Sequence, residues 1–139
     1  MHAHSNSIAV STQGFCDIHD ITRDVQNELK RSRIREGLAT VIVPGSTAGI
    51  TTIEFESGAV ADLKKAIERL APENIHYDHD ARWGDGNGFA HVRAALLGPS
   101  LTIPVAEGQL RLGTWQQIVV VDFDNRPRRR EVVIHLLGE

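Results

Sequence analysis

Residues 101–137, LTIPVAEGQLRLGTWQQIVVVDFDNRPRRREVVIHLL, contain the densest run of strand signals in the chain. Short stretches of β-branched and apolar residues are separated by turn-forming residues at 106–109 and 124–127. Neighbouring strands joined by short polar turns pair as antiparallel hairpins. This half of the chain therefore predicts antiparallel β structure and not a series of β-α-β units.

Three more strands are expected upstream, at residues 4–12, 38–43 and 50–55, where apolar or β-branched residues alternate or cluster. Two segments instead carry apolar residues at three- and four-residue steps, which predicts amphipathic helices at about 20–33 and 59–70. A short helix-prone stretch follows the middle of the chain. The expected fold class is α+β, a predominantly antiparallel, jelly-roll-like β-sandwich with two or three packed helices.

Length and composition predict one domain spanning residues 1–139, because 41% hydrophobic content is enough to build a core without disulfides. Cys16 is the single cysteine, which excludes an intrachain disulfide. The chain carries neither a signal-peptide pattern nor a run of eighteen apolar residues, so we expect a cytoplasmic protein without a membrane span. A net charge of −3 argues against a nucleic-acid-binding protein.

The segment at residues 77–91, YDHDARWGDGNGFAH, concentrates histidines, aspartates and glycines ahead of the short helix. The side chains of His79, Asp85 and His91 suit a borderline divalent metal or acid–base chemistry near neutral pH. A helix that begins near Asn87 would direct free N–H groups at an anion such as phosphate. The alternative is an ordinary solvated turn, since Asp, Asn and Gly are turn formers.

Two other segments are candidates for binding phosphate. Residues 45–49, GSTAG, offer hydroxyl and backbone donors without charge, although the same residues suit a plain turn between strands. Residues 126–130, RPRRR, carry guanidinium groups that match phosphate oxygens. Arginines at a hairpin end are more typical of a solvated sheet edge, and that interpretation is favoured here.

Several of these stretches, taken together, resemble the signature of the YjbQ-like proteins, a largely uncharacterised family sometimes called secondary thiamine-phosphate synthase. The resemblance is carried by 86–100, GNGFAHVRAALLGPS, by 103–105, IPV, by Gly108 and by 112–116, LGTWQ. Weaker matches at 46–51, at Arg128 and Arg129, and at Gly138 extend it over almost the whole chain. The resemblance implies a β-sandwich with flanking helices, a homotrimer, and a polar, metal-holding site near the histidine segment.

The family's motif residues fall on particular positions of this chain. His91 matches the histidine before the small-residue helix, and His79 matches the histidine of a Tyr/Glu-x-His element. Asp85 and Asn87 match an acidic and an amide position. Many members carry a further histidine where this chain has Gly45, so a metal here would rely on Asp85, Asn87 or water in its place.

The resulting hypothesis is a small cytoplasmic enzyme that acts on a phosphorylated metabolite, with weak thiamine-phosphate synthase activity as the reaction that the resemblance implies. The expected catalytic residues, which are also the expected ligands of a divalent metal (zinc or magnesium), are His79, His91 and Asp85. The expected phosphate-binding residues are Ser46, Thr47, Gly86, Asn87, Gly88 and Arg93. The alternative is a non-catalytic homotrimer that binds a metal or an anion through the same residues. Neither hypothesis includes a nucleic-acid or membrane partner.

Overall fold

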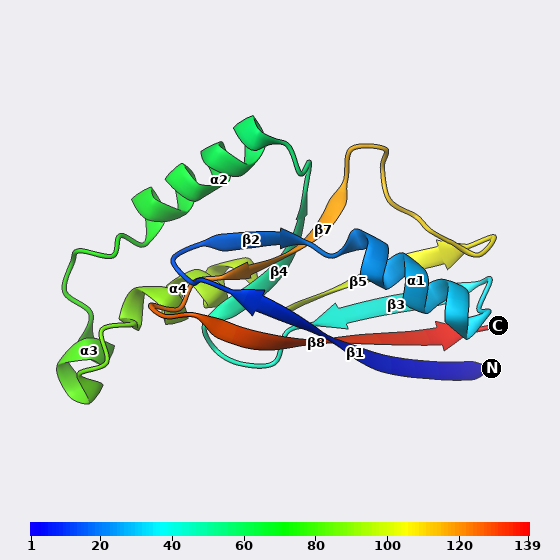
Figure 1. The fold of residues 1–139 in the computed structure, drawn as a ribbon, viewed down its shortest axis with the longest axis horizontal. Helices are drawn as coiled ribbons and strands as arrows, with labels where there is room; N and C mark the ends of the chain where they lie inside the picture. The colour runs from blue at the N-terminus through cyan, green and yellow to red at the C-terminus, as the bar shows by residue number, and fades with distance from the viewer.

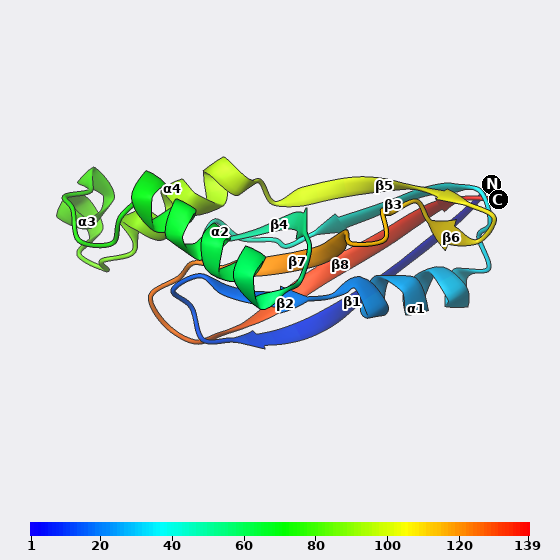
Figure 2. The same cartoon turned by 90° about the horizontal axis from the view of Figure 1, so that it is seen from above.

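Two antiparallel sheets form the body of the protein in the computed structural model, which describes residues 1–139 (Figures 1 and 2). The five-stranded sheet has the order β1 (His2–Thr12), β8 (Arg128–Gly138), β3 (Gly37–Ile42), β5 (Ser100–Ala106) and β6 (Gln109–Leu110). The three-stranded sheet has the order β2 (Asp17–Asp20), β7 (Gln117–Asp122) and β4 (Ala48–Ile53). Every strand pair is antiparallel, which confirms the predicted α+β class.

Four helices complete the fold: α1 (Thr22–Ser32), α2 (Ser57–Leu70), α3 (Asp78–Trp83) and α4 (Gly88–Leu97). α1 lies along the five-stranded sheet, whereas α2 and α4 cover the outer face of the three-stranded sheet (Figures 1 and 2). None of these helices is both long enough and apolar enough to cross a bilayer.

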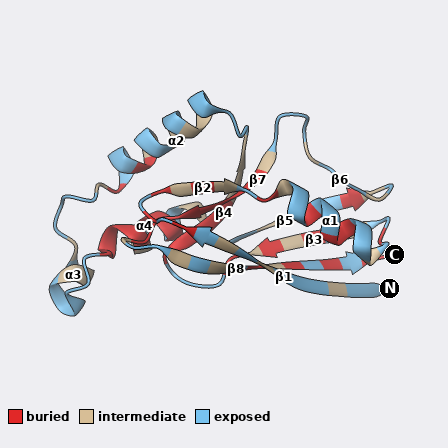
Figure 3. Ribbon diagram, in the orientation of Figure 1, coloured by how far each residue is buried: buried red, intermediate tan, exposed pale blue.

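Strand β7 lies at the centre of the molecule and contributes to two hydrophobic cores (Figure 3). Because side chains alternate along a strand, Ile118 and Val120 face the five-stranded sheet while Val119 and Val121 face α2 and α4. All four side chains are fully buried, and each such burial stabilises the fold by about 1.5–3 kcal/mol relative to exposure. The continuous apolar run in the sequence is therefore explained by a strand that is covered on both faces.

The first helix begins at Thr22, close to the predicted start at about residue 20, and a short strand precedes it. Residues 17–20 pair with β7 as strand β2, so Ile18 packs in the core beneath α2 and α4 and does not belong to α1. Asp20 then accepts hydrogen bonds from the backbone N–H and the hydroxyl of Thr22, at 2.9 and 2.6 Å, and stabilises the start of α1. Pairing with the central strand outweighs the local helical pattern in this segment.

Strand β1 and α1 are joined by a buried carboxylate. Glu28 of α1 is 1% exposed, and its side chain meets His4 Nε2 and Asn6 Nδ2 of β1 at 3.0 Å each, as well as Arg31. These hydrogen bonds, with the one from His4 largest, lower the pKa of Glu28 despite its burial. A buried, charged residue of the helix thus anchors α1 to the edge of the sheet.

The segment expected as a loop contains helix α3, which the sequence does not predict because six residues are too few to show an apolar period. Asp78 and Asp80 in its first turn complement the positive end of the helix, and Gly84 ends it in the left-handed conformation with φ +72°. The next helix, α4, begins at Gly88 with Asn87 at its N-cap, where the sequence predicts it. Both helices lie at the same end of the molecule (Figure 1).

The turn between β1 and β2 passes very close to residues 122–124. Gly14 has φ +83°, and a Cβ added there would lie 2.3 Å from the carbonyl oxygen of Asp124. The next two N–H groups, of Phe15 and Cys16, donate to the carbonyl oxygens of Asp124 and Asp122 at 2.8 and 2.9 Å. Only glycine allows this approach, which fixes the backbone that follows β7.

Replacing Gly14 with alanine is expected to destabilise the protein more than the same change at Gly84. Both positions have positive φ, which costs an alanine about 1–2 kcal/mol, but a Cβ at Gly84 meets no atom within 4 Å. The clash at Gly14 should raise the total loss to about 3 kcal/mol or more, measured by chemical denaturation of the two variants. Equal losses would contradict the close approach.

Candidate functional site

A polar pocket of about 480 Å³ opens where α3, α4, the turn after β3 and the start of β8 converge. Its walls are formed by Gly45, Ser46, Thr47, His79, Trp83, Asp85, Asn87, His91, Arg128 and Arg130. Trp83 is the only apolar side chain among them. The fold therefore gathers into one pocket six residues that the sequence analysis selected: Ser46, Thr47, His79, Asp85, Asn87 and His91.

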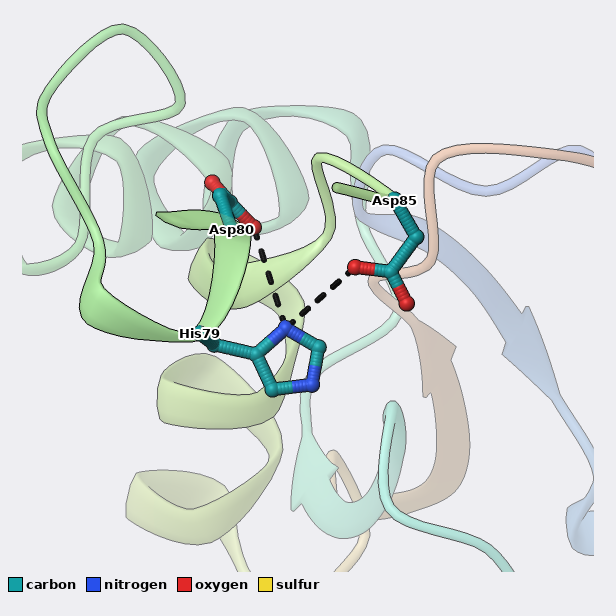
Figure 4. A group of neighbouring side chains, drawn as sticks. All are labelled: His79, Asp80 and Asp85. Carbon is teal, nitrogen blue, oxygen red and sulfur yellow. Dashed lines mark ion pairs between the residues drawn. The ribbon is translucent and has the colours of Figure 1, made fainter. Parts of the chain in front are cut away.

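The closest group of metal-ligating side chains in this region consists of His79, Asp80 and Asp85 (Figure 4). Nδ1 of His79 lies 3.3 Å from Oδ1 of Asp85 and 3.8 Å from Oδ1 of Asp80. The left-handed residue Gly84 turns the chain after α3, so that Asp85 comes back to face the imidazole. One ligand atom from each of the three residues lies within 4.8 Å of the others.

His91, the other predicted ligand, stands beside His79 and is not part of this group of three. The two imidazole rings are 4.3 Å apart at their centroids and inclined by 37°. Asp80 takes the third place, which the sequence analysis missed because adjacent residues on a helix point in different directions. His91 thus lines the same pocket from the first turn of α4.

Two buried aspartates lie beneath the pocket, and each is paired with an arginine from β8. Arg130 donates to both carboxylate oxygens of Asp122, at 2.7 and 2.9 Å, and to the hydroxyl of Thr47 at 2.7 Å. Arg128 donates through Nε to Asp124 at 2.7 Å. Both carboxylate side chains have no exposed surface. Such bidentate, charge-assisted bonds are the strong class of protein hydrogen bonds.

This pairing corrects the interpretation of residues 126–130 as a solvated edge. Arg126 and Arg129 are exposed, as that interpretation requires, but Arg128 and Arg130 face inward. The alternation of side chains along β8 explains the difference, because residues 128, 130 and 132 share one face of the strand. The arginine run thus supplies two pocket residues that the sequence analysis did not select.

The network keeps both aspartates ionised. Burial raises the pKa of Asp124, but hydrogen bonds from Asn87, the Asn125 N–H and Arg128 outweigh it and lower the pKa to about 2. For Asp122, burial again raises the pKa, and the bonds from Arg130 and Thr12 outweigh it and lower the pKa. The two arginine charges are consequently compensated within the protein. The carboxylate of Asp85 faces His79 at the mouth of the pocket without an arginine partner.

The orientation of the Asn87 side chain follows from this ionisation. Its Nδ2 donates to Oδ1 of Asp124 at 3.2 Å, and an ionised carboxylate only accepts hydrogen bonds, so Nδ2 and not Oδ1 must face it. Asn87 is 8% exposed, and its Oδ1 is buried without a partner, as is Nδ1 of His79. An unpaired buried polar atom costs about 1–3 kcal/mol. Asn87 therefore presents an acceptor, in contrast to the phosphate-donor role expected from the sequence.

Arg93 lies outside the pocket and is engaged elsewhere. It is 2% exposed, its Nε donates to the carbonyl oxygen of Ala71 at 2.9 Å, and its Nη2 pairs with Glu68 at 2.5 Å. The guanidinium carbon stands 4.9 Å from the centroid of the Phe89 ring. These contacts tie α4 to the end of α2, so Arg93 has no free donor that faces the pocket and its expected phosphate role is not supported.

The glycines expected to bind phosphate do not line the pocket either. The N–H of Gly88 donates to Oδ1 of Asp80 at 2.7 Å, so the first amide of α4 is already satisfied. A Cβ at Gly88 would lie 2.6 Å from Cβ of Tyr77, which explains glycine there by packing of α4 against the start of α3. Gly86 has φ +69° and serves the turn.

Known proteins match this chain in sequence and in structure over nearly its entire length. The family model described as UPF0047 protein YjbQ-like matches residues 6–139. A UPF0047 protein of Archaeoglobus fulgidus is 37% identical over 130 residues, covering 94% of this chain and 98% of the relative. The crystal structure of a YbjQ-like protein of unknown function from Sulfolobus solfataricus P2 has a TM-score of 0.94 and 33% identity, covering 99% of both chains. The crystal structure of a hypothetical protein from Aeropyrum pernix K1 has a TM-score of 0.91 and 34% identity, covering 98% of this chain and 99% of that one.

Acid should remove the stabilising contribution of Asp124. Its pKa is lowered from the ordinary 3.8 to about 2, so the contribution is full above pH 3.8 and is lost as pH falls through about 2. The shift corresponds to about 2 kcal/mol. Urea unfolding between pH 5 and pH 2 should therefore show a flatter pH profile for Asp124→Asn than for the unmodified protein. The exposed Asp62→Asn serves as control, and parallel profiles for all three proteins would contradict the network.

Proposed function

The chain belongs to the YjbQ-like UPF0047 family, and on that premise we propose that its pocket binds a divalent cation together with the phosphate group of a small metabolite, on which the protein acts as an enzyme. The observation that carries the proposal is the pair of buried, unpartnered polar atoms in one pocket, Nδ1 of His79 and Oδ1 of Asn87. A ligand that satisfies them would recover the cost of burying them.

The donor set suits a divalent ion. Ligand atoms that each lie 2.0–2.1 Å from a tetrahedral zinc are roughly 3.3 Å from one another. The distances from Nδ1 of His79 to the carboxylates of Asp85 and Asp80, 3.3 and 3.8 Å, are close to that spacing. An imidazole nitrogen with carboxylate oxygens favours zinc, whereas carboxylate and amide oxygens alone would favour magnesium.

Gly45 supports a site without the third imidazole that many family members have. Gly45 has φ +118°, and a Cβ there would come within 3.3 Å of Nη1 of Arg130. A larger side chain at this position would press on the guanidinium that pairs with Asp122. We infer that Asp85 and Asp80, together with the Asn87 oxygen or water, complete the set that His79 begins.

Phosphate would bind at the opposite wall, against the hydroxyl of Ser46 and the edges of Arg128 and Arg130. The Thr47 hydroxyl lies beside them, but its hydrogen is already donated to Asp124. Hydrogen bonding to Asp122 raises the pKa of Arg130, which keeps its charge at any physiological pH. Because Asp122 and Asp124 already compensate both arginines, these residues alone attract an anion weakly. Phosphate binding is therefore proposed to depend on the cation.

The chemistry divides between the cation and the residues of the chain. The cation would neutralise the charge of the phosphate when bound. His91, which lines the pocket beside His79, is the residue proposed to move a proton, whereas His79 and Asp85 are proposed to hold the cation. A thiamine-phosphate synthase-like transfer is the reaction class that the resemblance implies for these residues.

A second candidate is a non-catalytic metal-binding protein. The compensated arginines favour it, because a pocket without free positive charge does not need an anionic substrate. Both candidates share the cation and differ in whether phosphate binding follows it.

Calorimetric titration separates the two candidates and tests both. Zinc should bind the unmodified protein, and His79→Ala should weaken that binding at least about tenfold because a direct ligand is lost. Pyrophosphate should then bind only the zinc-loaded protein if the enzyme proposal holds. His91→Ala should lose pyrophosphate binding or turnover, whereas His76→Ala should lose neither, because His76 is exposed and pairs only with Asp78.

Three results of the titration would decide against one or both candidates. Zinc binding that is unchanged in His79→Ala contradicts both. Zinc binding without any pyrophosphate binding contradicts the enzyme and favours the binding protein. Pyrophosphate binding that is equal with and without zinc contradicts the dependence on the cation.

We also propose a homotrimer, an expectation that comes from the family resemblance. Apolar side chains that a monomer leaves in water support self-association, among them Trp115 at 71% exposure and Leu96 at 62%. Sedimentation equilibrium should give a mass of three 15.3 kDa chains. A monomeric mass at micromolar concentration would contradict the assembly.

A further inference from the structure

A second concave surface lies between the C-terminal half of α1 and the β5–β6 hairpin. These elements are at the opposite end of the molecule from α3 (Figures 1 and 2). It encloses about 700 Å³, a volume typical of small-molecule sites. The residues that line this groove are Gln26, Leu29, Lys30, Arg33, Ile34, Arg35, Gly108, Gln109 and Leu110. None of them was selected in the sequence analysis as part of a site.

Three cationic side chains line the groove, and none of them has an acidic partner. Lys30, Arg33 and Arg35 take part in no ion pair, and no carboxylate is among the lining residues. Three acidic residues are adjacent in sequence to lining residues. Glu107 is exposed and forms no ion pair, and the other two are engaged elsewhere. Glu28 is held by His4, Asn6 and Arg31, and Glu36 accepts the N–H of Glu107.

The dipole of α1 explains the position of only one of these three cationic residues. Lys30 lies in the last turn of α1, where a cation is favourable for the helix itself. Arg33 and Arg35 lie beyond the last helical residue and gain little from it. Three uncompensated cations in one groove repel each other, and an anion between them would relieve that repulsion.

Three of the nine side chains that line the groove are apolar, and they lie at its base. Leu29 and Ile34 are 3% and 2% exposed and belong to the main core, and Leu110 packs against the same core at the edge of the sheet. The charged groups therefore surround a hydrophobic base. A ligand that fits both parts must join an anionic group to an apolar body.

The backbone holds the cationic residues in place on both sides. Arg33 caps α1 in the left-handed conformation with φ +60°, where glycine or asparagine is usual. This turns residues 33–35 toward the groove. Across from them, the N–H of Gly108 donates to the carbonyl oxygen of Arg35 at 3.0 Å, and the Arg35 guanidinium lies against Gly108.

We propose that this groove binds a small organic anion in which a phosphate, sulfonate or carboxylate group is attached to an apolar body. The anionic group pairs with Lys30, Arg33 and Arg35, and the apolar body lies on Leu29, Ile34 and Leu110. The proposal is independent of the polar pocket and of any metal in it.

The test uses 1-naphthyl phosphate as probe, with inorganic phosphate and 1-naphthol as its two halves. Methyl-detected NMR titration of the full chain should shift the signals of Leu29, Ile34 and Leu110. The whole probe should bind at least about tenfold more tightly than either half, since it uses both the charges and the apolar surface.

Matched variants separate this groove from the rest of the surface. The double variant Lys30→Gln, Arg33→Gln should weaken probe binding at least about tenfold, whereas Arg23→Gln, an exposed arginine on the same helix that does not line the groove, should leave it unchanged. His79→Ala should also leave it unchanged. Loss of probe binding in the groove variant would therefore be independent of the loss of zinc binding expected for His79→Ala.

Four outcomes would overturn the proposal. These are equal binding by the double variant and the unmodified protein, equal binding of 1-naphthol and the whole probe, and signal shifts confined to the polar pocket. The fourth is groove signals that change with protein concentration and not with probe, which would assign the surface to a second copy of the chain.

Discussion

The pairing of Asp122 and Asp124 with Arg130 and Arg128 is the interaction on which the structure of the polar pocket depends. The two carboxylates have no exposed surface, and removing one partner of a buried ion pair typically costs about 3–5 kcal/mol because the other charge is left unpaired. The pairing also organises neighbouring segments. Thr12 from β1 and Thr47 from the turn after β3 bond to the same carboxylates, and Asn87 at the start of α4 donates to Asp124. Four other parts of the chain thus meet at these two side chains.

The same residue type has different consequences at the two ends of the protein. At the polar pocket Arg128 and Arg130 are compensated, so their main contribution is to shape the pocket and to orient Thr47 and Asn87. In the groove beside α1 the cations lack acidic partners and lie over an apolar base. Ligand preference is set in each place by which partners the fold supplies. For this reason we propose a cation for the first site and an anion for the second, although both are lined by arginines.

The sequence predicts the parts of this structure that local patterns determine. Strand alternation and apolar spacing identify the antiparallel strands and α2, and the glycine-rich segment places His79 beside Asp85. Features that depend on partners distant in the chain do not follow from such patterns. β2 forms because β7 is beside it, Arg128 and Arg130 turn inward because β8 packs over Asp122 and Asp124, and Arg93 serves the α2–α4 contact. Asp122 gives no signal in sequence, since a single aspartate at the end of an apolar strand is equally typical of a solvated turn.

The most direct measurement of the central claim is anomalous diffraction from crystals soaked in zinc at the zinc absorption edge. The account predicts a peak about 2.0–2.1 Å from Nδ1 of His79, with a carboxylate oxygen of Asp85 as a second ligand. A well-occupied peak elsewhere on the chain, or an imidazole of His79 that remains without a ligand at saturating zinc, would contradict it.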